Sequence, residues 1–251
     1  MKRSIGALML ALGLAAAAQA RADPRLDEKV YAPYVLNHVA ELEVRRGQEV
    51  GGADAGEATT VLEAEYGVND RVSLALIGGI ATAPGEGSAF NSVGVEGVVY
   101  LGQIPRIGVD AGLYLEYKHG LNGESDAGEA KLLLAKTSGR FQGLLNLIVE
   151  RPLGAPPGEG FASYGYAVSA TWRTVGALRL GAEAFGDLGT DHGFLTGPQG
   201  AYVGPQLKWE GTPPGSPVEI DLDLGWLAAV GADRNEARSQ VRLGIELERR
   251  F

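Results

Sequence analysis

The stretch RIGVDAGLYLEYK, residues 106–118, decides the fold of this 251-residue chain. Successive side chains of a β-strand point to opposite faces, so an alternating sequence separates an apolar face from a polar one. A helix would spread the charged residues of this stretch over all its sides, so the pattern predicts a strand. The apolar face carries Ile107, Val109, Ala111, Leu113, Leu115 and Tyr117.

The same alternation recurs along most of the chain and predicts about twelve strands. The segment 128–136 contains AKLLLAK, which breaks strict alternation, so counts of ten and fourteen stay open. The predicted strands are 39–46, 59–67, 71–80, 92–101, 106–118, 128–136, 140–150, 161–173, 177–187, 201–210, 217–230 and 238–251.

The connections between these segments alternate in length. Those at 67–70, 102–105, 137–139 and 174–176 are short, and the others are longer and rich in Gly, Pro and charge; 211–217 is the one exception. Outer-membrane barrels have short periplasmic turns and longer outer loops. A two-sheet sandwich gives no reason for this alternation. We therefore predict an all-β fold: a closed antiparallel transmembrane β-barrel, an up-and-down meander of about 12 strands.

The first 22 residues have the features of a secretory signal peptide. Lys2 and Arg3 precede an apolar run over 5–18, and Ala20–Ala22 provides a small-x-small cleavage site. We expect a signal peptide at 1–22, a periplasmic lead at 23–35 and the barrel at 36–251. The lead could enter the lumen as a plug, but a flexible tail is the favoured expectation.

Composition excludes several classes of function. The chain has no Cys, so it has no disulfide, thiolate metal site or cysteine nucleophile. Its formal charge of −9 argues against nucleic acid as a partner, because phosphate binding needs a basic face. We expect no metal and no cofactor.

The apolar face of each strand should meet lipid, because charged side chains are costly there. Aromatic side chains on this face should then collect at the two membrane interfaces. We expect Tyr66, Phe141, Trp172, Trp209 and Phe251 at the periplasmic girdle, and Tyr117 and Tyr164 at the outer girdle.

The closing stretch VRLGIELERRF, residues 241–251, resembles the end of Gram-negative outer-membrane β-barrel proteins. In that class the last strand alternates and ends on Phe, so the resemblance implies that Phe251 is the signal read by the barrel-assembly machinery. It also implies an outer-membrane location, with membrane lipid and lipopolysaccharide as partners. Arg249 departs from the pattern, which usually has an apolar residue there. Residues 28–47 resemble the opening of poorly characterised proteobacterial barrels, which implies no activity.

The polar face of the predicted strands should line the lumen, and its charges are unevenly placed. Closure sets the last strand beside the first, so four strands form one acidic wall. The acids of this wall are Glu41, Glu43, Glu63, Glu65, Glu219, Asp221, Asp223, Glu246 and Glu248, against the bases Arg45, Arg242 and Arg250. The rest of the lumen is more balanced, with Lys118, Lys131, Arg173, Arg179 and Lys208 against Asp110, Glu116, Glu129, Glu150 and Glu183.

Two interpretations of this lumen stay open. In the first, the acidic wall gives a narrow, porin-like passive channel a preference for small cationic solutes. In the second, the charges form a paired network that fills a non-conducting structural, assembly or adhesion barrel. Neither the solute nor the oligomeric state follows from the sequence.

An outer-membrane hydrolase is the third and least favoured class. A nucleophile and a base must lie within reach of each other. Of the three histidines, His38 and His119 have no Ser or Thr two residues away, and His192 has Thr190 but no Ser at that spacing. Asp191 and His192 are the only candidates, and a solvated loop histidine is the simpler interpretation of this pair.

Overall fold

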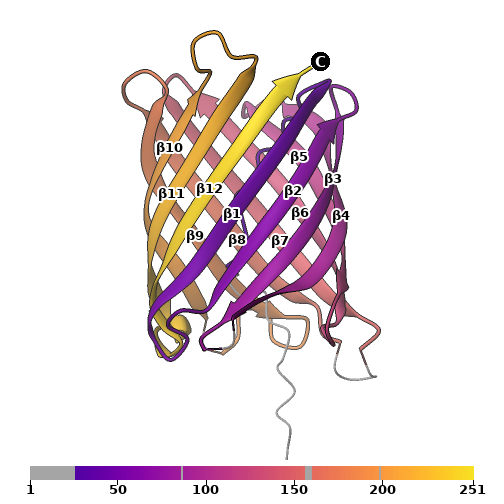
Figure 1. Cartoon of the computed structure of the whole chain (residues 1–251), viewed down its shortest axis with the longest axis vertical. Coiled ribbons are helices and arrows are strands. Elements are labelled where there is room, and N and C mark those ends of the chain that lie inside the picture. Colours follow the sequence, from indigo (N-terminus) through magenta and orange to yellow (C-terminus); the bar gives the residue numbers. More distant parts are fainter. Residues whose placement is uncertain (1–25, 86, 156–159, 198) are drawn as a thin grey trace, which may run out of the picture.

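The structure, a computed structural model, describes residues 26–85, 87–155, 160–197 and 199–251. The predicted signal peptide and the first residues of the lead lie outside this range. Twelve strands each pair antiparallel with the next one in sequence, and the last pairs with the first. Figure 1 shows the resulting tilted, closed cylinder. The predicted all-β barrel with an up-and-down meander is confirmed.

The twelve strands occur in the predicted order along the chain. The strands are β1 (Val39–Gly52), β2 (Ala58–Gly67), β3 (Val72–Ala83), β4 (Gly87–Ile104), β5 (Val109–Gly120), β6 (Asp126–Ser138), β7 (Phe141–Leu153), β8 (Ser163–Arg173), β9 (Leu178–Thr190), β10 (Gly200–Gly211), β11 (Val218–Gly231) and β12 (Ala237–Arg250). A single 3₁₀ turn, η1 (Ala232–Asn235), precedes β12. Among the residues described, no helix is long and apolar enough to cross a bilayer.

Several strands run further than the sequence predicts. β1 continues to Gly52 and β4 occupies Gly87–Ile104, so only 84–86 separate β3 from β4. The prediction of a long connection there is wrong, because the backbone ladder continues beyond the alternating apolar core of the hairpin to the pair Ala83–Gly87.

The two ends of the barrel differ in their connections. We call one of them the short-turn end, at the top of Figure 1, and the other the long-loop end. The short-turn end carries the connections 68–71, 105–108, 139–140, 174–177 and 212–217.

The outward face of the barrel is apolar. Leu42, Leu74 and Leu76 are 59–66% exposed there, as expected for side chains that meet lipid rather than a protein core. Tyr66, Phe141, Trp172, Trp209 and Phe251 lie outward within two residues of a strand end at the short-turn end. Tyr117 and Tyr164 lie outward toward the long-loop end, where the Tyr164 ring meets Phe194 edge-on.

The irregular segment near 128–136 forms strand β6. Its broken alternation has a physical reason, because Leu133 faces inward and is fully buried in a cluster with Tyr31, Val98 and Tyr114. Tyr31 in this cluster precedes the first strand, so a segment outside the barrel wall supplies part of the lumen core.

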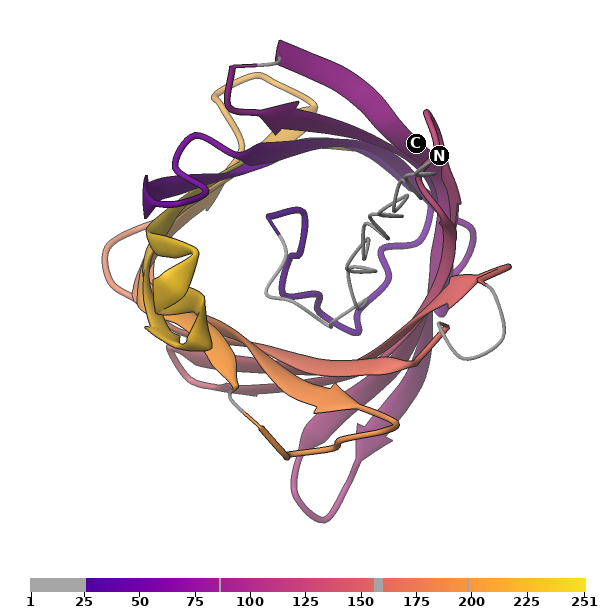
Figure 2. The ribbon, with the colours of Figure 1, turned by 90° about the horizontal axis from the view of Figure 1, so that it is seen from below.

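The N-terminal segment, residues 26–38, lies inside the barrel. Figure 2 shows its indigo ribbon within the ring of strands. Tyr31 is 6% exposed, and Pro33 is fully buried against Gly112 of β5. The expectation of a flexible tail is therefore wrong for residues 26–35. Ion pairs and buried rings hold this stretch in the lumen, and they compensate the entropy of ordering it.

Candidate functional site

The lumen brings the nine predicted acids together on β11, β12, β1 and β2. Strand register places them in two rows that cross these four strands, and Asp223 follows one step further along β11. Like charges opposite each other repel, so the rows need cations or water. The row nearer the short-turn end is Glu65, Glu41, Glu248 and Glu219; the second is Glu63, Glu43, Glu246 and Asp221.

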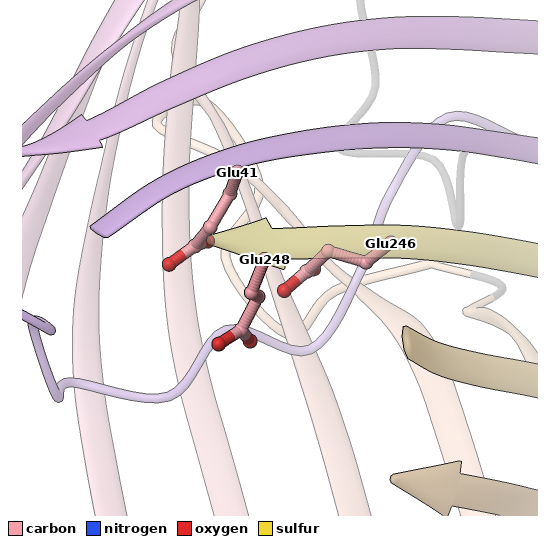
Figure 3. Close-up of side chains that lie close together, drawn as sticks. All are labelled: Glu41, Glu246 and Glu248. Atoms are coloured by element: carbon pink, nitrogen blue, oxygen red, sulfur yellow. The ribbon is translucent and has the colours of Figure 1, made fainter. Parts of the chain in front are cut away.

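Carboxylates of the two rows converge near the short-turn end. One oxygen each of Glu41, Glu246 and Glu248 lies within 4.8 Å of the others, close enough to share one cation. Figure 3 shows these side chains reaching toward one another from β1 and β12. All three are half-buried. Glu63, Glu65 and Glu96 form a second such group.

Cations of the chain itself neutralise part of the second row. Lys29 of the N-terminal segment lies 2.5 Å from Glu43 and 3.3 Å from Glu63, and Arg45 pairs with the same two carboxylates. Burial alone would lower the pKa of the Lys29 ammonium, but Glu43 and Glu63 raise that pKa well above its ordinary value. This half of the acidic wall is therefore a paired network.

Two more ion pairs and a double hydrogen bond anchor the N-terminal segment. Asp27 lies 3.1 Å from Lys118 of β5, and Glu28 pairs with the buried Lys131 of β6. The Tyr31 amide donates to Asn146 Oδ1 at 2.7 Å, and Asn146 Nδ2 donates to the Tyr31 carbonyl at 2.9 Å. The Asn146 amide therefore makes the same pair of reciprocal hydrogen bonds with the Tyr31 backbone that a residue of a neighbouring β-strand would make.

The other bases predicted for the lumen, on the acidic wall and beyond it, have different surroundings. Lys208 pairs with Asp223 at 3.0 Å, and the buried Arg179 donates to Thr171. The Arg242 guanidinium lies 4.2 Å from the centre of the Phe185 ring. Arg173 and Arg250 are exposed near the short-turn end, where they do not join these buried contacts.

An apolar arc faces the N-terminal segment from the opposite side of the lumen. We use the name apolar arc for Ile148, Ala167, Phe185, Tyr202 and Leu227, which lie on β7 to β11. All are at most 9% exposed, and Val30 of the N-terminal segment packs against them. Side chains fill the interior of eight-stranded barrels, whereas barrels of 16–18 strands leave an aqueous channel, so a lumen of twelve strands lies between these cases.

A cavity of about 460 Å³ is lined both by the N-terminal segment and by most acids of the acidic wall. Its apolar lining includes Val30, Leu144 and Phe185. Gly244 of β12 also lines this space, and a Cβ on it would lie 3.5 Å from Asp223 Cβ. The acids of the lining are Glu41, Glu43, Glu65, Glu183, Glu210, Asp221, Asp223, Glu246 and Glu248.

The hydrolase candidates lie apart from this cavity. His192 is exposed in the loop that follows β9, and its ring centre lies 4.0 Å from that of Phe161 with the two rings tilted at 57°. No hydrogen bond joins the side chains of Asp191 and His192 in the part of the chain that the structure describes. A different pair, His119 and Asp126, does hydrogen-bond, at 2.7 Å on the outer face.

Similar architecture occurs in solved outer-membrane proteins. The COG4313 outer membrane channel from Pseudomonas putida F1 superposes with a TM-score of 0.56 over 89% of this chain and 97% of that one, at 12% identity. The chain has the fold of Gram-negative outer-membrane β-barrels. A second similar structure is the Acinetobacter baumannii outer membrane protein Omp33. The match covers 86% of this chain and 99% of Omp33, at 14% identity and a TM-score of 0.44. No family model and no curated protein sequence matches this outer-membrane-type barrel.

Sequence reasoning missed the residues by which the N-terminal segment docks in the lumen. Lys29, Tyr31 and Asn146 act together although the last two are 115 residues apart. The signal that could have found them is the set of apolar residues on the inward parity, Leu133, Phe185 and Leu227, because a water-filled lumen would not select them.

Proposed function

We propose that this barrel is a narrow, passive outer-membrane channel that prefers small cations. The observation that carries the proposal is the cavity of about 460 Å³ along the acidic wall. Lys29 and Arg45 neutralise Glu43 and Glu63, while Glu41, Glu246 and Glu248 converge at the cavity with no base of the described chain bound to them. Rings of carboxylates favour cations in channels.

The likeness to a channel of the same architecture supports this proposal at the level of the fold. We further propose that an N-terminal signal peptide exports the chain and that the barrel-assembly machinery inserts it. In this orientation the short-turn end faces the periplasm, so the acidic cavity receives solutes from that side.

Single-channel recording in planar bilayers tests the function. We expect small conductances and a reversal potential that indicates cation preference in a KCl gradient. The triple variant Glu41→Gln, Glu246→Gln and Glu248→Gln should lower that preference. Asp126→Asn is the matched control, because it removes a carboxylate on the outward face near the long-loop end. Anion preference of the native barrel would contradict the proposal.

A filled, structural barrel is the second candidate. The observation that favours it is that every strand contributes an inward side chain at most 9% exposed, among them Arg45, Val61, Tyr114 and Gln240. Such a barrel gives no current under any condition, and liposomes that contain it should not swell in salts or sugars.

A further inference from the structure

Among the described residues, the ion pairs and hydrogen bonds given above attach the N-terminal segment to one side of the lumen. Its ion pairs and hydrogen bonds described above end on β1, β2, β5, β6 and β7, and the Tyr31 hydroxyl adds Glu96 of β4 at 3.3 Å. Toward β8–β11 the segment offers Val30, which makes apolar contact with the arc. Charged contacts of this kind are strong and directional, whereas an apolar contact is not.

Polar space lies on both sides of this apolar contact. Val30 and Phe185 both belong to the lining of the acidic cavity. Further toward the long-loop end, Glu49 Oε1 accepts hydrogen bonds from Tyr202 at 3.1 Å and Gln240 at 2.9 Å. Glu49 is 7% exposed, and its Oε2 has no hydrogen-bond partner within the described residues. A buried carboxylate oxygen without a protein partner is normally hydrated, so water belongs at this position.

We propose that the apolar arc and Val30 form the gate of the lumen. The gate opens between Val30 and the arc while the rest of the N-terminal segment stays attached to β1–β7. A thin apolar layer between two hydrated compartments blocks ions by excluding water, and it conducts when it becomes wet. This inference rests on the proposed channel function and assigns the residues that regulate it.

The distinguishing experiment compares two buried leucines of the lumen. Leu227 and Leu133 are both fully buried, but Leu227 belongs to the arc and Leu133 packs with Tyr31 on the attached side. Leu227→Ala should raise the open probability at least about tenfold, because truncating a buried leucine removes most of the packing that closes the layer. Leu133→Ala should leave the open probability near that of the native barrel. Phe185→Ala is the second arc variant if Leu227→Ala does not fold.

A reversible tether then separates gate opening from departure of the segment. The chain has no Cys, and a Cβ on Gly112 would lie 2.8 Å from Pro33 Cβ, about 1 Å less than a disulfide spans. A small shift therefore accommodates the pair Pro33→Cys and Gly112→Cys. With this pair added, Leu227→Ala should conduct equally before and after reduction.

Three results would overturn the gate. The first is current that appears only after the tether is reduced, which makes the whole segment the barrier. The second is opening by Leu133→Ala and not by the arc variants. The third is absence of current in every variant, reduced or oxidised, which also removes the channel function. Anion-selective current that rises with Leu227→Ala would contradict the cation preference and leave the gate in place.

Discussion

Asn146 should control how firmly the N-terminal segment stays docked. Its side chain is fully buried and exchanges two hydrogen bonds with the Tyr31 backbone, at 2.7 and 2.9 Å. Asn146→Leu keeps a similar volume but leaves the buried Tyr31 amide and carbonyl without these partners. Each such group costs about 1–3 kcal/mol, so the docked state should lose about 2–6 kcal/mol.

Hydrogen exchange of the segment measures this loss directly. If residues 27–34 exchange through undocking, their amides should exchange about 30-fold to 10⁴-fold faster, because about 1.4 kcal/mol corresponds to one decade. The measurement is mass spectrometry of a peptide that covers these residues, on barrels folded in detergent. The strand peptides should retain their protection, and heat-modifiable gel mobility checks that the barrel stays closed.

Gln206→Leu is the matched control for this experiment. Gln206 is a lumen amide that is 3% exposed, and its hydrogen bonds go to Ser169, Glu183 and Asp223 of the wall. The Gln206→Leu variant should leave the hydrogen exchange of residues 27–34 unchanged. Acceleration of less than about tenfold in Asn146→Leu, with the barrel folded, would refute the reasoning that these two hydrogen bonds hold the segment.

Three other predictions concern topology, assembly and stability. Protease added to whole cells should cut within 188–200 and spare 174–176, and the reverse pattern refutes the proposed orientation. Deletion of Phe251 should lower the yield of folded barrel in the outer membrane, as measured by heat-modifiable mobility, while refolding in detergent should change little. Lys131→Met should destabilise the barrel to urea by about 3–5 kcal/mol, because it removes the ammonium that pairs with the Glu28 and Glu129 carboxylates, whose side chains are 9% and 11% exposed. The double variant with Glu28→Gln should recover part of that loss, and no recovery would contradict the pairing.

Alternation along the strands was enough to predict which side chains face the lumen, because the period of two is a local property of the backbone. Closure alone was enough to place Glu41 and Glu248 on neighbouring strands, whereas their register, directly opposite each other, comes from the structure. The docking of Tyr31 could not be predicted, because it depends on a side chain far along the chain. Composition also gave no reason to expect order before residue 36, since a stretch with several charges and two prolines has no alternating face.

The longer strands were missed for a related reason. Beyond the membrane, hairpins such as β3–β4 need no apolar face, so their pairing leaves no periodic signal. The structure places the nine acids on four adjacent strands. Their partial neutralisation was not predicted, because Lys29 was assigned to a tail. The sequence left open whether the lumen is empty or filled. That question depends on inward side chains such as Leu133, Phe185 and Leu227, which follow the strand alternation but are apolar where a water-filled lumen would be polar.

The one-sided attachment of the N-terminal segment bears on the order in which the protein is built. Its charged and hydrogen-bonded contacts lie on β1 to β7, and these strands precede the rest of the chain. Residues 27–31 can therefore dock on a half-completed, open sheet, before β12 reaches β1 to form the seam. Neutralisation of Glu43 and Glu63 by Lys29 would then come early, when repulsion between the inward carboxylates would otherwise oppose curling of the sheet. The docked segment would then stabilise the curved form of the first half of the barrel during assembly.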